Sequence, residues 1–438
     1  MTPGARSQTA IELLDDLPAG RAADRYLSGY FRSHRFIGAK DRREIADLVF
    51  GVYRRRAQLD WWIAGGAARA VDPGNRARVL AARALLSGWD EDAIVTAFDG
   101  GRYRPKPLSN EERSLFARLN GGGTLLDEPN QPGPVRYNYP EWLDPQLRQS
   151  LGDNFEAEMA ALLGPASVDL RVNRLKATRV KVLALLAAEG IDAASTPYSP
   201  DGVRLQARRT LPALKVFSSG MIEVQDEGAQ IASRMVDARP DHTIVDFCAG
   251  AGGKSLAMAA TMQGKGRIFA CDTNAGRLAR LGPRLERAGI VDMVQGSLLD
   301  DENFAEAIEI GTFDRVLLDA PCSSTGAWRR NPDARWRLTP ESLDHEVARQ
   351  RDILTKAAVL PAIGGRLIYV TCSILRRENE EQIEWFLRSR PDYVQVPAGK
   401  VWAETIGGKG PQGGPALRLS TARYGTDGFF VAILERVR

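Results

Sequence analysis

Apolar runs alternate with helical segments from residue 243 onward, and this alternation constrains the fold more than any other feature. Four runs have the character of buried strands: Thr243–Cys248, Arg267–Asp272, Phe313–Asp319 and Gly365–Thr371. Helical patterns begin near Lys254 and Thr339, and another covers Ala275–Ala288. Strands that alternate with helices predict a mostly parallel, doubly wound, Rossmann-like α/β sheet.

Two cysteines directly follow strands of this predicted sheet, in Asp319-Ala-Pro-Cys322 and Thr371-Cys372-Ser373. Ligands of open α/β sheets bind at the carboxyl ends of the strands, so both thiols can face one substrate. A thiolate that attacks carbon 6 of cytosine makes carbon 5 nucleophilic, and the carbon 5 proton must later be removed. The pair therefore predicts chemistry on a pyrimidine base, with one thiol attacking and the other helping to end the reaction. Their spacing leaves open which does which.

Three other side chains complete this prediction. Asp319 can bond the ring near nitrogen 3 if it is protonated, or hold the ring in register. Cys248 and Cys271 are expected to be small buried hydrophobic residues rather than nucleophiles. None of the four cysteines forms a Cys-x-x-Cys pair and the three histidines are isolated, so no metal site is expected.

A glycine-rich turn lies between the first of these strands and its helix. It runs Cys248-Ala249-Gly250-Ala251-Gly252-Gly253-Lys254. Asp272 ends the next strand, where an acid typically binds a ribose, so the two together favour a dinucleotide or S-adenosylmethionine over a purely structural turn. The glycine spacing argues against a nicotinamide cofactor. Phe247 stands where a phosphate loop needs its first glycine, which argues against an ATPase.

Composition is that of an ordinary globular protein, with 44% hydrophobic and 26% charged residues in 438. There is no membrane-spanning apolar stretch and no secretory signal pattern, so we expect a cytoplasmic monomer without membrane association. The net charge of +4 is compatible with a nucleic-acid partner but does not establish one.

The chain is expected to hold three parts. Residues 1–125 are predicted to be helical, residues 126–139 a glycine- and proline-marked linker, residues 140–240 a small α+β module, and residues 241–438 the Rossmann-like domain. In the helical part, Ile45, Leu48, Val49 and Val52 form one apolar helix face. The basic residues around it are equally consistent with a solvated face and with a phosphate-binding patch: Lys40, Arg42, Arg43 and Arg54–Arg56.

Aromatic residues and arginines interleave after Cys322, over Thr325–Arg337. Such a mixture favours base stacking and phosphate contact. The alternative is a solvated loop with core tryptophans.

These motifs resemble those of the bacterial Sun-type ribosomal RNA cytosine-5 methyltransferases, which carry a NusB-like helical domain before the catalytic domain. The two cysteine motifs and Glu378-Asn379-Glu380 match the catalytic domain. Gly38–Arg43 with Val49–Tyr53 looks like the helical RNA-binding domain. The family's bridging segment is matched by Leu170–Asn173, Gly220 and Val224–Asp226.

The resemblance implies a division of labour. Cys372 is then the nucleophile and Cys322 the residue that helps release the product. The loop from Cys248 to Lys254, with Asp272 and Asp319, then contacts S-adenosylmethionine or borders its site. The implied reaction is methylation of a cytosine at carbon 5 in RNA, with small-subunit (16S) ribosomal RNA as the leading target. A transfer RNA target, or a non-catalytic RNA-binding or ribosome-assembly factor, are the alternatives.

Two positions depart from the family pattern. Ala251 replaces the usual loop proline, beside Gly250 where alanine is common. Ser297 stands where an acid near the adenine is expected, with Asp300 close by.

Overall fold

The chain forms two units, each with its own core. The computed structural model describes residues 1–18, 20–66, 72–120, 126–207, 211–299, 310–408, 410 and 414–438. The first unit comprises Met1–Arg148, Phe155–Gly164 and Trp328–Thr339, and the second comprises Gln149–Asn154, Pro165–Ala327 and Pro340–Arg438. Both units are therefore assembled from separate stretches of the chain.

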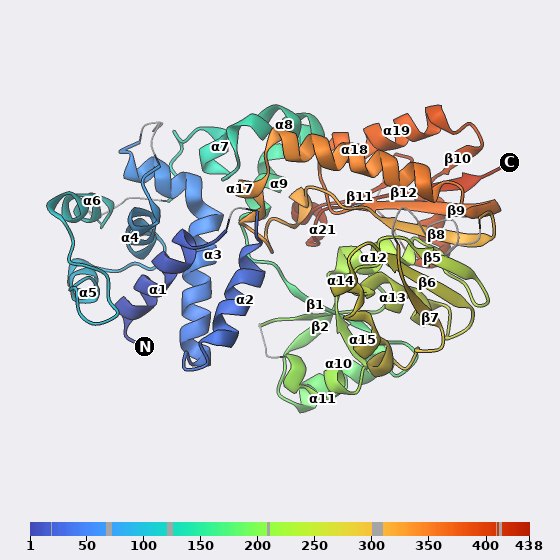
Figure 1. Ribbon diagram of the computed structural model, residues 1–438, viewed down its shortest axis with the longest axis horizontal. Coiled ribbons are helices and arrows are strands. Elements are labelled where there is room, and N and C mark those ends of the chain that lie inside the picture. The colour runs from blue at the N-terminus through green and yellow to red at the C-terminus, as the bar shows by residue number, and fades with distance from the viewer. Residues whose placement is uncertain are drawn as a thin grey trace. The chain divides into compact units, whose positions relative to one another are not determined.

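The described part of the first unit is helical, as predicted (Figure 1). Its helices are α1 (Pro3–Asp15), α2 (Ala23–Ser33), α3 (Ala39–Ile63), α4 (Asn75–Leu85), α5 (Glu91–Ala97), α6 (Asn110–Asn120), α7 (Gly133–Arg136), α9 (Phe155–Ala161), α17 (Ala334–Arg337) and most of α8 (Asp144–Leu151). Ile45, Leu48, Val49 and Val52 are all buried on one face of α3. The predicted apolar face is therefore part of this unit's core.

The stretch predicted as a linker, residues 126–139, is packed into the first unit. Gln58 is fully buried on α3, and its amide donates to Asp127 at 2.6 Å. The Asn138 amide in turn donates to Gln58 at 2.6 Å. Glycine and proline mark irregular backbone here, but side-chain hydrogen bonds from a helix fix that backbone in place.

The segment rich in aromatic residues and arginines also belongs largely to the first unit, which corrects the RNA-stacking prediction. Trp328 and Arg335 are fully buried, and the Arg335 guanidinium lies 5.0 Å from the Trp328 ring centroid. Arg335 donates to the carbonyl of Asn138 at 2.8 Å, and the Trp336 indole donates to the carbonyl of Tyr53 at 2.7 Å. These side chains therefore hold the interior of the helical unit together.

The second unit contains a small antiparallel sheet in the order β2-β3-β1-β4. Its strands are β1 (Val168–Val172), β2 (Ala193–Ser195), β3 (Gly202–Leu205) and β4 (Ile222–Val224), with helices α10 (Arg179–Ala188) and α11 (Lys215–Ser218). Leu170, Val172, Val203 and Ile222 form a separate core with these helices.

The large sheet has the order β10-β12-β9-β8-β5-β6-β7, with β11 paired to β12. Its strands are β5 (Thr243–Asp246), β6 (Arg267–Asp272), β7 (Val294–Leu298), β8 (Phe313–Asp319), β9 (Pro361–Thr371), β10 (Tyr393–Val396), β11 (Leu417–Leu419) and β12 (Phe429–Arg436). Across the sheet, the neighbouring strands β9, β8, β5, β6 and β7 are parallel to one another, whereas β12 runs antiparallel to β9. The sheet is thus mostly parallel, as the alternating pattern predicted.

Helices cover both faces of this sheet (Figure 1). They are α12 (Glu227–Arg234), α13 (Gly253–Thr261), α14 (Ala275–Leu278), α15 (Leu281–Ala288), α18 (Pro340–Ala357), α19 (Glu380–Ser389), α20 (Ala398–Thr405) and α21 (Thr421–Tyr424). Leu317 joins the core that contains α13 and α15 residues, while its neighbours Val316 and Leu318 join the core that contains α18 and α19 residues. Because side chains alternate along a strand and both faces are covered, these strands are continuously apolar.

The helix predicted over Ala275–Ala288 is divided into α14 and α15. Pro283 lies in the first turn of α15, where the missing N–H costs nothing. Its ring would clash with the carbonyl four residues earlier in a continuous helix, so the chain breaks before Leu281.

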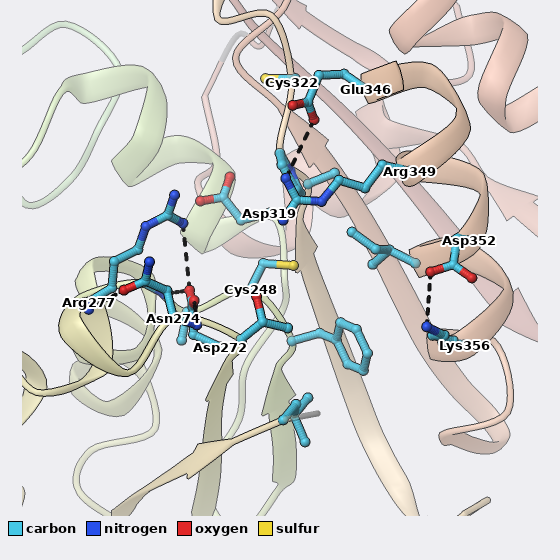
Figure 2. A pocket seen from close by; sticks show the side chains of 18 of the residues that line it. Cys248, Asp272, Asn274, Arg277, Asp319, Cys322, Glu346, Arg349, Asp352 and Lys356 are labelled. Atoms are coloured by element: carbon cyan, nitrogen blue, oxygen red, sulfur yellow. Dashed lines mark hydrogen bonds and ion pairs between the residues drawn. The ribbon is translucent and has the colours of Figure 1, made fainter. Parts of the chain in front are cut away.

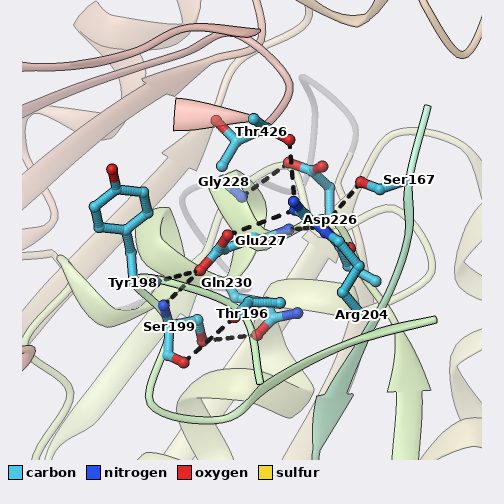
Figure 3. A network of polar contacts seen from close by, with 12 residues as sticks. Ser167, Thr196, Tyr198, Ser199, Arg204, Asp226, Glu227, Gly228, Gln230 and Thr426 are labelled. Atoms are coloured by element: carbon cyan, nitrogen blue, oxygen red, sulfur yellow. Dashed lines mark hydrogen bonds and ion pairs between the residues drawn. The ribbon is translucent and has the colours of Figure 1, made fainter. Parts of the chain in front are cut away.

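A polar network ties the small sheet to the large one within the second unit (Figure 3). The buried Glu227 carboxylate accepts the backbone N–H groups of Tyr198 and Ser199 at 2.6 and 2.8 Å. Asp226 accepts the N–H of Asp427, at the start of the segment that leads into β12. The bridging segment expected around Val224–Asp226 therefore connects the two sheets.

Candidate active site

A cavity of about 630 Å³ opens at the carboxyl ends of β5, β6, β8 and β9. Its lining includes predicted residues from each of these strand ends: Cys248, Ala249, Gly250, Asp272, Asp319, Cys322 and Cys372. Figure 2 shows acidic and sulfur-containing side chains from these loops around the cavity, with helix α18 alongside. The strand-end position is where open α/β sheets bind ligands.

The two cysteines meet in this cavity. The Sγ atoms of Cys322 and Cys372 are 3.5 Å apart, because β8 and β9 are adjacent parallel strands that end together. The Cys372 Sγ also lies 3.5 Å from the Ser324 hydroxyl. Ser324 has a positive φ of 56°, a strained conformation for a serine that often marks a functional loop. Both thiols therefore line the same cavity, and their roles toward a substrate stay a prediction.

The surroundings move the pKa values of the two thiols in opposite directions. The hydrogen bond between the two sulfur atoms, aided by Ser324 and opposed by burial, lowers the pKa of Cys372 below its usual value. The same bond, together with burial, raises the pKa of Cys322 well above its usual value. Cys372 is therefore the thiol that ionises more readily, which is the property of an attacking group.

The other two cysteines remain thiols. Burial, with the nearby Asp319 charge, raises the pKa of Cys248 far above the usual range. Cys271 is fully buried, and burial raises the pKa of its thiol to about 12. This agrees with the expectation that neither is a nucleophile, although Cys248 does line the cavity.

Lys254 contributes a buried positive charge beside the reactive groups. Its ammonium donates to the Asp319 carboxylate at 2.5 Å. Burial is the largest single influence and disfavours the charged form, but the charge and hydrogen bond of Asp319, together with the charge of Asp246, raise the pKa of Lys254. Asp319 thus acts as an acceptor toward Lys254, which favours the holding role over the donating role that the sequence left open. The charge of Asp319 disfavours the thiolate of Cys372, and the charge of Lys254 partly offsets that effect.

The glycine-rich loop is held from both sides. Gly252 has φ 77°, and a Cβ there would lie 2.1 Å from the Leu281 side chain, so only glycine fits. Arg284 donates to the carbonyl of Ala251 at 2.6 Å and is itself paired with Glu223 at 3.0 Å. The loop is therefore fixed by neighbouring side chains even though Ala251 replaces a proline.

Asp272 is placed as an acceptor at the edge of the cavity. Its two carboxylate oxygens accept the N–H groups of Gly250 at 2.9 Å and Asn274 at 2.7 Å. A carboxylate has about four acceptor positions, so capacity is left for the hydroxyl groups of a ribose.

Four predicted cofactor residues do not line the cavity: Ala251, Gly252, Gly253 and Lys254. Of these, Lys254 is bonded to the lining residue Asp319. Ser297 lies on β7 beside Cys271 and is not among the lining residues, whereas the apolar Leu299 is. Asp300 lies outside the described residues.

One face of α18 lines the cavity and was not predicted. It carries Glu346, Arg349, Asp352, Ile353 and Lys356. Their spacing of three to four residues places them on one side of the helix, and Asp352 pairs with Lys356 at 3.0 Å (Figure 2). Charges at this spacing also occur on solvated helix faces, so the sequence offered no signal that a cavity lay beside them.

The basic residues singled out in the first unit differ in exposure. Arg55 donates to Gln58 at 3.0 Å and Arg56 lies 3.7 Å from Asp72, and burial lowers the pKa of both. Lys40 and Arg43 are instead exposed. Of the basic residues singled out from the sequence, only Lys40 and Arg43, at the beginning of α3, are exposed.

Within the described ranges, no helix is long and apolar enough to cross a membrane. In that same part of the chain, no group of three or more histidine, cysteine or acidic side chains is arranged to hold a metal ion.

Two family models match the chain. One, described as 16S rRNA methyltransferase RsmB/F, matches residues 233–435. The other, described as an RsmF/B-like ferredoxin-like domain, matches residues 139–211, which include most of the small sheet.

Individual proteins match over nearly their whole lengths. The probable ribosomal RNA small subunit methyltransferase B of Synechocystis sp. is 31% identical over 91% of this chain and 92% of its own length. Its counterpart in Bacillus subtilis is 30% identical over 98% of both chains.

Solved structures agree on the fold. The crystal structure of PH0851 has a TM-score of 0.77 at 28% identity and covers 100% of both chains. NSun6 from Pyrococcus horikoshii with SFG has a TM-score of 0.60 at 21% identity, over 68% of this chain and 98% of its own, and supports the fold alone.

Proposed function

The chain belongs to the RsmB/F family of 16S rRNA methyltransferases, and we propose that it methylates carbon 5 of a cytosine in small-subunit ribosomal RNA through a covalent bond to Cys372. It is an S-adenosylmethionine-dependent enzyme. The observation that carries the covalent part of the proposal is the pair of thiols 3.5 Å apart in one cavity, with their pKa values moved in opposite directions.

In this proposal the two thiols act in sequence. The Cys372 thiolate attacks carbon 6 of the flipped-out cytosine, and the ring electrons move toward carbon 5. Asp319, fixed by Lys254, holds the ring in register. After carbon 5 has received its methyl group, a base takes the carbon 5 proton, the electrons of that bond re-form the double bond between carbons 5 and 6, and the Cys372 thiolate leaves carbon 6 with the help of Cys322.

The residues around the cavity suit S-adenosylmethionine. Asp272 keeps acceptor capacity for ribose hydroxyls, and Ala249 and Gly250 of the glycine-rich turn line the cavity, where these small residues let a ligand approach the backbone. Phe247, Leu299 and Ile353 supply apolar surface for a base. When bound, the cofactor supplies an activated methyl group.

We further propose that the helical unit is a NusB-like domain that binds RNA. Exposed arginines and a lysine support this: Arg32, Arg35, Lys40 and Arg43. They flank Phe36, whose side chain is 79% exposed. Exposed aromatic rings among positive charges suit single-stranded RNA.

The assigned roles predict opposite behaviour of two variants. Cys372→Ala should abolish methylation and form no covalent RNA adduct, because the attacking atom is gone. Cys322→Ala should accumulate the adduct, visible as a slowly migrating protein band on a denaturing gel, because release is blocked. An adduct formed by Cys372→Ala would show that the nucleophile is assigned wrongly.

The target can be tested in cells. Bisulfite mapping of ribosomal and transfer RNA, with and without the gene, should show one cytosine in 16S ribosomal RNA that loses protection when the gene is deleted. Loss of a transfer RNA site instead would redirect the proposed substrate. A map without any lost site would overturn the cytosine-5 activity.

A further inference from the structure

A buried carboxylate lies behind the two cysteine loops. Glu378 ends a short 3₁₀ turn, Arg376–Glu378, and is fully buried. Its Oε1 accepts the backbone N–H of Ser323 at 2.8 Å and the Gln350 amide at 3.0 Å. Its Oε2 accepts the hydroxyls of Ser373, at 2.5 Å, and Ser323. Four donors therefore converge on one side chain that does not line the cavity.

The donors come from the two loops that carry the thiols. Ser323 directly follows Cys322, and Ser373 directly follows Cys372. One carboxylate thus joins the residues adjacent to both cysteines. Thr325 strengthens the connection, since its hydroxyl lies 3.0 Å from that of Ser373 and accepts the N–H of Ile374.

Glu378 is itself held in place. The Tyr369 hydroxyl donates to its carbonyl at 2.7 Å. Gln350, on α18, donates both to Glu378 and to the carbonyl of Pro321 at 2.9 Å. Burial raises the pKa of Glu378, while the hydrogen bonds from Ser323 and Ser373 oppose that rise. Burying a carboxyl group is costly unless it is well bonded, so a core position that keeps one has a use for its bonds.

We infer that Glu378 is a positioning residue that holds Cys322 and Cys372 at the separation and orientation that their different roles require. It touches neither the cavity nor a thiol and acts through Ser323 and Ser373. The inference rests on the proposed roles of the two cysteines. It is tested by thiol chemistry that needs neither RNA nor S-adenosylmethionine.

The test compares Glu378→Ala, Glu378→Gln and a matched control in the full-length protein. The control is Asp237→Asn, since Asp237 is a buried carboxylate of the same unit that accepts from Arg315 at 2.8 Å and does not line the cavity. Two rates are measured: diamide-driven formation of the Cys322–Cys372 disulfide, and iodoacetamide alkylation of each cysteine across a pH series. Mass spectrometry resolves the individual thiols, and circular dichroism confirms folding.

Glu378→Ala should slow both disulfide formation and Cys372 alkylation at neutral pH by about tenfold, since it removes the charged acceptor to which both cysteine loops are hydrogen-bonded. The turnover number for methylation should fall while the KM for RNA stays unchanged. Glu378→Gln should restore most of both thiol rates, because its carbonyl oxygen still accepts from the Ser323 N–H and its NH2 group can donate to the Ser373 hydroxyl oxygen. Asp237→Asn should leave both rates at the wild-type value.

Wild-type thiol rates in a folded Glu378→Ala protein would overturn the inference. So would equal losses in Glu378→Gln and Glu378→Ala, because the link survives in the first. If Glu378→Ala does not fold, Ser373→Ala removes one link and must slow disulfide formation. Absent methylation in the wild-type protein would count against the proposed function, and the thiol rates would still decide the role of Glu378.

Discussion

At the scale of single residues, Asp246 is a buried carboxyl group whose burial lowers the stability of the folded protein. It ends β5 directly before the glycine-rich loop and is fully buried. The Ser255 hydroxyl donates to its Oδ2 at 2.6 Å, whereas its Oδ1 has no hydrogen-bond partner among the described residues. Burial, with the charges of Asp319 and Asp272 adding to it, raises the pKa of Asp246 to about 7.

The raised pKa of Asp246 predicts that the stability of the protein depends on pH. Because its folded-state pKa lies above the unfolded value of 3.8, the folded state keeps its proton while the unfolded state loses it. Stability should therefore fall as the pH rises from about 4 to about 7, by up to about 4 kcal/mol, and then level off. Asp246→Asn should remove this part of the dependence.

The measurement is urea unfolding of both proteins across that pH range. The difference in unfolding free energy should move in favour of Asp246→Asn as the pH rises. A constant difference would contradict the prediction, whatever its size, because a lost hydrogen bond alone does not depend on pH.

At the scale of elements, the glycine-rich loop depends on segments far from it in the chain. Arg284 of α15 bonds the Ala251 carbonyl, and Glu223 of β4 holds Arg284. The small sheet therefore supports the glycine-rich loop beside the large sheet through two side chains. This explains how the loop stays ordered without the proline that relatives were expected to carry.

Replacing Arg284 tests that support. Arg284→Leu should weaken binding of S-adenosylhomocysteine by about tenfold, because one hydrogen bond to the loop is worth about 1–1.5 kcal/mol. Arg280→Leu is the control, since Arg280 is exposed one turn earlier. Isothermal titration calorimetry gives both affinities, and equal values would show that the loop does not need Arg284.

At the scale of the whole molecule, neither unit is a continuous piece of chain. The helical unit includes Trp328–Thr339, which begins six residues after Cys322. Asp333 from this segment accepts the N–H of Ala23 at the start of α2. The N-terminal part thus completes its core with residues from the catalytic half.

A fragment of residues 1–125, ending where the sequence suggested a boundary, should therefore not fold cooperatively. It lacks Asp127 and Asn138, which bond Gln58, and it lacks Trp328 and Arg335 from the core. Thermal unfolding followed by circular dichroism should show a broad, weak transition, compared with the sharp one of the full chain. A sharp transition in the fragment would show that residues 1–125 form a complete domain.

The sequence by itself determined the parallel sheet, the apolar face of α3 and the meeting of Cys322 and Cys372. These follow from periodicity and from the rule that neighbouring parallel strands end at one edge, which depend on local order along the chain. Tertiary structure alone decided that Trp328 and Arg335 are core residues, that residues 126–139 are packed, and that α18 lines the cavity. It also decided that Glu378 joins both cysteine loops. Each of these depends on which distant groups surround a side chain, because burial and hydrogen-bond partners across the fold cannot be read from spacing along the chain.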